Sequence, residues 1–259
     1  DGRAEFDRKD IVEAMTTIES GTAVGVNYIE EETRAVAIHE AGHAVTAHVY
    51  MKDVLSTRLS IRMRGGSLGH HQAIEKEERF SSWRHEFVGR LVWTLGAMAA
   101  EHVFYGENGN GVGGDIQSAT WNAAMMVGAS GMGPEPLDLR GRVPKERLDE
   151  VEGELMERFE RIGLQIMNRA SGGSAMDSNP VRAVLGDRAK RSAAAQILGQ
   201  AYLTAVSCVR ANREAVLRVA DALVARKELY GDEVVELLEA VEPLPPTIDV
   251  LDEEIWPKV

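Results

Sequence analysis

The chain has little of what several protein classes require. Its 259 residues include a single cysteine, and 29 lysines and arginines stand against 41 acids, for a net charge of −12. One cysteine excludes an internal disulfide, and Cys208 lies in an apolar stretch that predicts a position in the core. Because there is no basic stripe that could displace counterions, we do not expect nucleic acid as a partner.

Aromatic residues and long apolar runs are also scarce. Aromatics make up 5% of the chain and there are 8 prolines, which argues against a β-sandwich. The longest apolar run, from Leu91 to Ala100, ends at Glu101 and is too short to cross a bilayer. With 44% hydrophobic and 27% charged residues, the composition favours a mainly α globular protein.

The most informative feature that is present is a His-Glu-x-x-His motif at residues 39–43, inside a helix-forming run. Residues four apart lie on one face of an α-helix, so His39 and His43 can both direct an imidazole at one metal ion. Glu40, one step round the helix, is then placed to take a proton from water at that metal. The motif therefore predicts the first half of a zinc hydrolase site.

A catalytic zinc ion needs three protein ligands and a water, so a third ligand must come from elsewhere in the chain. His48 lies about 140° round the helix from the motif, and we expect it to be a partly exposed helix residue instead. Glu101 and Asp115 are the remaining candidates. Asp115 follows a glycine-rich stretch at 106–114 and stands where the next helix would have its N-cap, so ligand and plain N-cap are both open interpretations.

Further motifs follow in a specific order. They are Leu-Gly-Ala-Met-Ala-Ala-Glu at 95–101, Tyr-Gly at 105–106, and Gly-Gly-Asp-Ile at 113–116 followed by Ala-Thr at 119–120. In this order and spacing the chain resembles the peptidase domain of the FtsH family, the membrane-bound AAA+ ATP-dependent zinc metalloproteases. The resemblance covers most of residues 27–134 and resumes from about 189 to 241.

The resemblance implies a role for each site residue. His39, His43 and Asp115 correspond to the ligands of one Zn²⁺ ion per chain, and Glu40 corresponds to the catalytic base. Glu101 corresponds to a glutamate near the metal, which we interpret as a contact of a ligand and not as a ligand itself. The implied fold is mainly α, a helical zincin-type metalloprotease domain with a small β-sheet or hairpin next to the zinc helix.

The resemblance also implies partners outside this chain. The expected substrates are unfolded polypeptides, delivered by an upstream AAA+ ATPase in a homo-hexamer, with ATP bound only on that ATPase. The chain itself has no Gly-Lys pair and hence no Walker A loop. An anchor outside the chain would hold the protein on the cytoplasmic side of a bacterial membrane, while this part of it would be soluble.

Two alternatives stay open. Ala97, Met98 and His102 depart from the usual residues of the FtsH-family motif, which favours a degenerate zinc-binding domain for docking or assembly with little proteolytic activity. The second alternative is a stand-alone zincin whose third ligand is Glu101 and which has no ATPase partner. A helix within residues 1–21, which resembles the last helix of an AAA+ lid, argues against this second alternative.

Between the zinc helix and Glu101 the hydrophobic period changes from 3.6 to 2. Residues 58–64 alternate between apolar and mostly basic side chains, which predicts a strand with one apolar and one basic face. After a Gly-Gly-Ser turn, residues 68–74 can form a second strand. A strand beside a zincin site can bind an extended peptide at its edge, and a plain hairpin is the alternative interpretation. On the first interpretation the substrate-binding residues are Leu68, Gly69, His70 and His71.

Most of the remaining chain is expected to be helical. Asp7, Asn27, Ser82 and Pro144 can each open a helix, and the helix after Ser82 is expected to run through to Ala99. A flexible loop is expected at 173–179, and further helices at 189–210, 212–226 and 232–241. The expected domains are the end of an AAA+ lid at 1–25, a zinc metallopeptidase domain at 26–241 with a divergent insertion at 138–187, and an extended acidic tail at 242–259.

Overall fold

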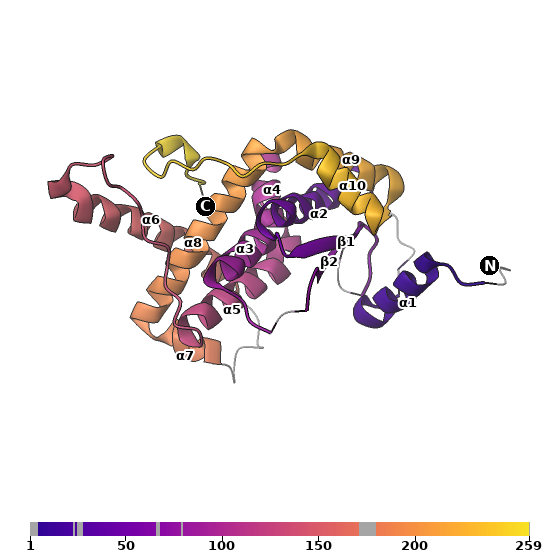
Figure 1. Cartoon of the computed structure of the whole chain (residues 1–259), viewed down its shortest axis with the longest axis horizontal. Coiled ribbons are helices and arrows are strands. Elements are labelled where there is room, and N and C mark those ends of the chain that lie inside the picture. Colours follow the sequence, from indigo (N-terminus) through magenta and orange to yellow (C-terminus); the bar gives the residue numbers. More distant parts are fainter. Residues whose placement is uncertain are drawn as a thin grey trace.

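The computed structural model describes residues 5–22, 24, 28–65, 68–78, 80–170 and 180–258. This part of the chain is mostly helical and contains one small antiparallel sheet, which confirms the expected mainly α fold (Figure 1). The α-helices are α1 (Arg8–Ser20), α2 (Glu30–Tyr50), α3 (Arg84–Thr94), α4 (Gly96–Tyr105), α5 (Gly113–Gly128), α6 (Leu148–Ala170), α7 (Pro180–Gly186), α8 (Arg188–Ala211), α9 (Arg213–Arg226) and α10 (Asp232–Val241). The strands are β1 (Val54–Ser60), β2 (His70–Glu75) and β3 (Glu228–Tyr230).

Helix α2, which carries the His-Glu-x-x-His motif, runs through the middle of the core. Nearly all of its side chains from Val36 to Val49 are buried, and it packs against α3, α4 and α9. Its small residues allow this close packing, since a Cβ atom on Gly42 would lie 2.5 Å from the carbonyl oxygen of Gly96 on α4. Helix α2 begins at Glu30 with Ile29 as its N-cap, whereas Asn27, the predicted cap, lies outside the described residues.

The sheet has the strand order β2-β1-β3, with both pairings antiparallel, so β2 is an edge strand of the described sheet. Strand β2 matches the second predicted strand to within two residues at its start, while β1 begins four residues before the predicted 58–64. The register between β1 and β2 shifts between Ser56 and Arg58. Strand β1 also contacts α2, which brings the sheet next to the motif helix.

The basic face predicted for residues 58–64 is only partly solvated. Arg58 and Arg64 are 0% and 2% exposed, because acidic groups from distant parts of the chain neutralise them. Glu228 on β3 pairs with Arg58, and Glu13 on α1 pairs with Arg64 at 2.6 Å. The ring of Tyr230 covers the Arg58 guanidinium at 5.2 Å. This cluster joins α1 to the sheet.

The helix predicted to run from Ser82 to Ala99 is in fact two helices. The first, α3, has Trp83 as its N-cap, and the chain breaks between Thr94 and Gly96 before α4 begins. At the break Gly96 lies against α2, where a Cβ atom would come within 2.1 Å of Thr46 Oγ1. The turn therefore allows α4 to pack directly on the motif helix.

The predicted helices of the C-terminal half are confirmed as α8, α9 and α10, and Pro144 precedes a short 3₁₀ turn that leads into α6. Helix α7 was not predicted, and the whole of the predicted loop 173–179 falls outside the described residues. Helices α6 and α8 pack through Gly163 and Gly199, at which an added Cβ would meet the backbone of the other helix at about 2 Å. The tail returns over α6 and α8, and Arg158 covers the ring of Trp256 at 4.1 Å.

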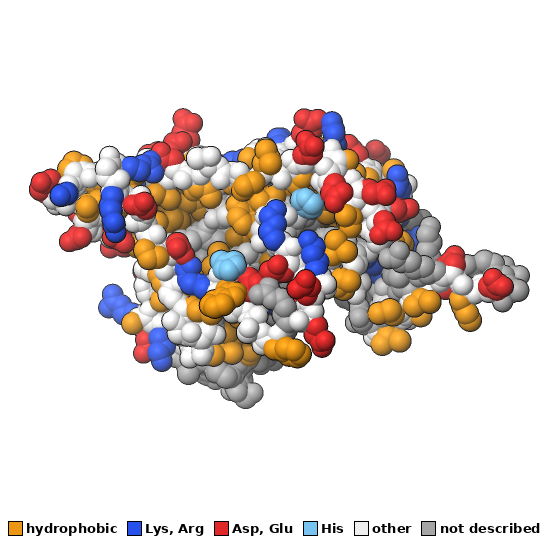
Figure 2. All heavy atoms as spheres, in the orientation of Figure 1, with side chains coloured by type: hydrophobic (Ala, Val, Ile, Leu, Met, Phe, Trp, Pro, Cys, Tyr) orange, Lys and Arg blue, Asp and Glu red, His pale blue; other side chains and the backbone are white. Residues whose placement is uncertain are grey.

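Helix α1 protrudes from the rest of the fold (Figure 1). Asp7 caps it, as predicted, and forms reciprocal hydrogen bonds with Asp10. Ile11, Met15 and Ile18 are exposed along it, and Figure 2 shows hydrophobic side chains gathered there. Within the described residues no helix is sufficiently long and apolar to cross a membrane.

Candidate metal centre

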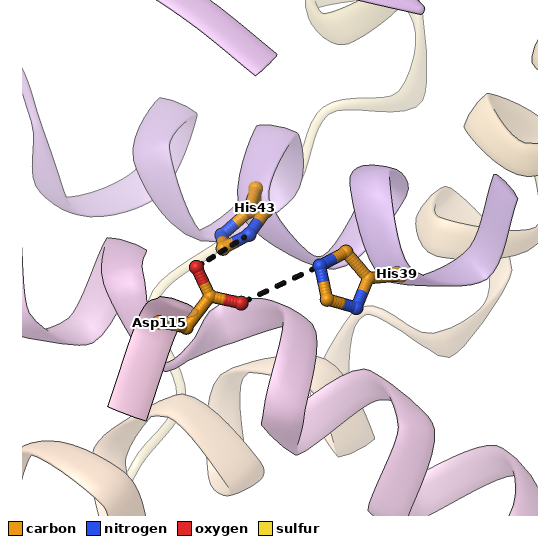
Figure 3. Close-up of side chains that lie close together, drawn as sticks. All are labelled: His39, His43 and Asp115. Atoms are coloured by element: carbon orange, nitrogen blue, oxygen red, sulfur yellow. Dashed lines mark ion pairs between the residues drawn. The ribbon is translucent and has the colours of Figure 1, made fainter. Parts of the chain in front are cut away.

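The structure brings His39, His43 and Asp115 together. Helix α2 presents His39 and His43 one turn apart, and α5 presents Asp115 opposite them (Figure 3). The Nε2 atom of His39 lies 3.4 Å from one Asp115 carboxylate oxygen, and Nε2 of His43 lies 3.5 Å from the other. One ligand atom from each residue can be chosen so that all lie within 4.8 Å of one another.

Asp115 is not an N-cap, contrary to the sequence-based placement. Helix α5 begins at Gly113, with Val112 as its N-cap, so Asp115 lies in the first helical turn. The partial positive charge at the N-terminus of the helix stabilises the negative carboxylate of Asp115, which points across to α2. Neither Gly113 nor Gly114 would bring a Cβ atom within 4 Å of any other group, so close packing does not explain the glycines there.

The second ring nitrogen of each histidine has its own partner. Nδ1 of His39 lies 2.8 Å from Glu101 Oε1, and Nδ1 of His43 lies 3.0 Å from the backbone oxygen of Trp93. A carbonyl oxygen can only accept, so His43 donates through Nδ1 and leaves Nε2 unprotonated in the neutral ring. A histidine held in this way is prepared to bind a metal through Nε2.

Glu101 is in turn fixed by the loop that follows α4. Its Oε2 accepts from the backbone N–H of Gly109 at 2.8 Å. The side chain amide of Asn108 donates to the carbonyl of Met98 at 2.7 Å and approaches the same Oε2 atom at 3.4 Å. Glu101 therefore stands on the Nδ1 side of His39, on the opposite edge of the ring from Asp115. This geometry agrees with a glutamate that orients a ligand.

Glu40 lies beside this cluster and is 4% exposed. Its Oε2 atom is buried and has no hydrogen-bond partner in the described part of the chain. Gly69, just before β2, leaves room for the carboxylate, since a Cβ atom there would lie 2.3 Å from Glu40 Oε1. Burial raises the pKa of Glu40, while His39 and His43 act to lower it.

The charges of the cluster are strongly coupled. Burial alone would lower the pKa of His39, but its hydrogen bonds with Asp115 and Glu101 raise that pKa to about 10. Burial would raise the pKa of Asp115, yet His43 and His39 hold it well below the usual range. The two carboxylates therefore favour a positive charge on the histidine pair, which a divalent cation can supply as well as a proton.

The donor set fits Zn²⁺. Two imidazole nitrogens and one carboxylate oxygen form a known catalytic zinc set, with the fourth position left for water. Ligand bonds of the usual length place tetrahedral ligand atoms roughly 3.3 to 3.5 Å apart. The nitrogen–oxygen separations of 3.4 and 3.5 Å, each to a different oxygen of Asp115, are close to this range.

A cleft of about 1080 Å³ opens beside the cluster and is lined by His39, Glu40, His43, Glu101 and Asp115. The residues proposed from the sequence to bind substrate, Leu68, Gly69, His70 and His71, also line it. Other lining residues belong to no sequence motif and were therefore not predicted: Arg90, Trp93, Asn110 and Asn122. His48 is half-buried on another side of α2, and neither it nor His102 lines this cleft.

Comparison with known proteins gives a consistent result. The sequence profile of peptidase family M41 matches residues 26–156. The chain is 31% identical over 239 residues to ATP-dependent zinc metalloprotease FtsH 4 of Sphaerobacter thermophilus, covering 92% of this chain and 33% of that protein. It is 27% identical over 246 residues to FtsH 2 of the same organism, covering 95% and 33%. To ATP-dependent zinc metalloprotease FtsH of Thermotoga maritima it is 36% identical over 137 residues, covering 52% and 22%. The chain thus spans about a third of the length of the two Sphaerobacter thermophilus relatives.

Proposed function

Because the chain belongs to peptidase family M41, we propose that it is the zinc-dependent endopeptidase domain of an ATP-dependent protease. Its substrates would be unfolded polypeptides. The observation that carries this proposal is the position of Glu40 next to His39, His43 and Asp115, with a buried oxygen that has no hydrogen-bond partner among the described residues. Such an oxygen can accept a proton without first losing another hydrogen bond.

The proposed chemistry assigns one task to each side chain. A Zn²⁺ ion held by His39, His43 and Asp115 would supply a Lewis acid for the scissile carbonyl and would lower the pKa of a bound water. Glu40 accepts the proton of the attacking water and donates it to the leaving amine as the peptide bond breaks. Glu101 keeps the proton of His39 on Nδ1, so that Nε2, which faces Asp115, has its lone pair free for the metal.

The substrate would bind as an extended strand beside β2. This strand lies at the edge of the described sheet, and the segment 68–71 lines the cleft next to Glu40. An edge strand can bind a peptide through main-chain hydrogen bonds, which recognise an unfolded chain and do not depend on its sequence. Leu68, Gly69 and His70 are the proposed contacts, whereas both ring nitrogens of His71 are engaged within the protein.

The proposed parent protein is larger than this chain. We propose that residues 1–25 are the end of an AAA+ lid, followed by the peptidase domain at 26–241 with its divergent insertion at 138–187 and by the tail at 242–259. The parent would be a homo-hexamer that binds ATP on its ATPase part and is anchored at the cytoplasmic side of a bacterial membrane. The relatives that carry the name ATP-dependent zinc metalloprotease support this proposal.

The experiment that tests the proposed function is the variant Glu40→Gln. The amide is nearly isosteric but cannot accept the water proton, so zinc content should be unchanged while hydrolysis of an unfolded, labelled casein is lost. Zinc content and turnover are measured on the same sample, with a chelator-treated parent as control. If Glu40→Gln retains activity within tenfold of the parent, another residue is the base and the proposed mechanism is wrong.

The same assay separates the protease from a degenerate docking domain. A parent chain that binds one Zn²⁺ per chain but cleaves unfolded casein no faster than its chelator-treated form would support the docking alternative. The departures at Ala97, Met98 and His102 motivate this control. Ala97 and Met98 are buried on α4 outside the cleft lining, which is compatible with retained chemistry.

A further inference from the structure

A chain of hydrogen bonds next to the metal centre has no part in the mechanism above. The indole Nε1–H of Trp93 on α3 donates to Nδ1 of His71 on β2 at 2.8 Å. The other ring nitrogen of His71, Nε2, lies 2.8 Å from the hydroxyl of Ser56 on β1. Three separate elements thus meet at one imidazole.

The protons in this chain can be assigned from chemistry alone. An indole N–H can only donate, so Nδ1 of His71 must accept and cannot carry a proton. The neutral ring then has its proton on Nε2, which donates to Ser56 Oγ. Both ring nitrogens of His71 are therefore engaged within the protein. His71 has no lone pair left for a metal and no free N–H for a substrate.

Trp93 connects this imidazole to a proposed metal ligand. Its side chain is held by His71, and its backbone oxygen accepts from Nδ1 of His43 at 3.0 Å. The ring of His71 lies nearly parallel to that of His43, with an interplanar angle of 15° and centroids 6.4 Å apart. It meets the Trp93 ring almost at a right angle, at 5.2 Å.

The position of Trp93 explains why its oxygen is available. Trp93 lies in the last turn of α3, where a carbonyl lacks the i+4 donor of a continuing helix; its oxygen is approached by the N–H of Leu95, the C-cap, and a carbonyl oxygen has a second lone pair for another donor. The break before α4 thus makes this oxygen available to His43. The backbone at a helix end is also less constrained than in the middle of a helix. A hydrogen bond to the Trp93 side chain can therefore help to hold its backbone oxygen in place.

We propose that His71 is a positioning residue, which with Ser56 and Trp93 forms a brace that sets the orientation of His43. This inference rests on the proposed function, since it treats His43 as a zinc ligand. It replaces the role of substrate contact that the sequence suggested for His71. The brace acts through Trp93, because the backbone oxygen of this residue keeps the His43 proton on Nδ1.

The test uses two replacements of nearly equal size at His71. In His71→Asn the amide oxygen can take the place of Nδ1 and accept from the indole, whereas in His71→Leu no acceptor remains. We expect His71→Leu to weaken zinc binding about 10-fold, at the lower end of the range for groups that orient a ligand. His71→Asn should stay within about threefold of the parent. Trp93→Phe, which removes the indole N–H, should resemble His71→Leu.

The double variant Trp93→Phe with His71→Leu gives a second criterion. Both single changes break the same bond, so their effects on zinc affinity should not add. Trp121→Phe, at an exposed tryptophan on α5 outside the cleft, is the matched control and should leave zinc affinity unchanged. Zinc affinity is measured by competition with a chromophoric chelator, and the absorption spectrum of the Co²⁺-loaded proteins reports the geometry of the site.

Each outcome has a definite meaning. Equal zinc affinity and equal Co²⁺ spectra for parent, His71→Leu and His71→Asn would overturn the brace. An equal loss of zinc affinity in both His71 variants, together with a lower unfolding temperature of the metal-free proteins, would also overturn the brace, because a purely structural role of His71 gives this result. If the parent binds zinc and cleaves unfolded casein, and the His71 variants bind zinc equally well, only the brace is refuted. A parent that binds no zinc refutes the proposed function and the brace together.

Discussion

Gly69→Ala offers a way to displace the proposed base without removing it. The three atoms nearest to a Cβ at this position all belong to Glu40, at 2.3 to 2.8 Å. Since ordinary contact begins near 3.4 Å, the carboxylate would have to move by about 1 Å. It is the far end of a flexible side chain, so it will move more easily than the backbone of the strand. Misplacement of a catalytic group by about 1 Å can cost on the order of 100-fold in rate.

We therefore expect Gly69→Ala to lower kcat/KM for an unfolded substrate about 100-fold at unchanged zinc content. Gly111→Ala is the matched control, because Gly111 lines the same cleft and a Cβ there would meet nothing within 4 Å. Peptide hydrolysis and metal content are measured on all variants. Activity of Gly69→Ala within threefold of the parent would refute the reasoning, since the carboxylate would then not need the position it occupies.

Further predictions concern the ligands, the packing and the buried charges. Asp115→Ala should abolish tight zinc binding, while Glu101→Ala should weaken it about 10- to 100-fold in a chelator competition; the opposite order would exchange their roles. Gly199→Ala should destabilise the fold by about 1 to 3 kcal/mol, because its Cβ would lie 2.0 Å from the Phe159 oxygen, and should lower Tm, unlike Gly153→Ala in open space. Burial would raise the pKa of Glu228, but Arg58 and Ser60 lower it below its ordinary value of 4.5. The contribution of ionised Glu228 to the free energy of unfolding is therefore complete above about pH 4.5 and is lost as the pH falls further. Urea unfolding should thus show Glu228→Gln less stable than the parent by about 3 kcal/mol at pH 7, with the difference shrinking in acid; a constant difference would contradict this.

The sequence predicted local features of the fold well. The helices α8, α9 and α10 follow from apolar periodicity, and the Asp7 cap follows from a local pattern with Asp10. The burial of Arg58 was not predictable in the same way, because its partner Glu228 lies 170 residues away in the chain. The break between α3 and α4 was also missed. It depends on contact of Gly96 with α2, which no periodicity within the segment reveals.

For the site, the motif was sufficient to group His39, Glu40 and His43, since their spacing on one helix fixes their relative positions. The approach of Asp115 depended on family resemblance, and its place inside α5 became visible only in the structure. The function of Gly69 as the space for the Glu40 carboxylate could not be inferred, because a glycine before a strand usually suggests a turn. The contacts of His71 with Trp93 and Ser56 join three elements and leave no sequence signal.

The close glycine contacts between helices affect how mutational scans of this protein should be interpreted. At Gly42, Gly163 and Gly199 any side chain would overlap the backbone of a neighbouring helix, so nearly every substitution should fail. In a saturation scan scored by survival, these positions would look as intolerant as His39 or His43, although they perform no chemistry. Only a score that separates the amount of folded protein from its turnover would distinguish the two groups. Intolerance alone would thus overstate the size of the active site and extend it into the helix contacts.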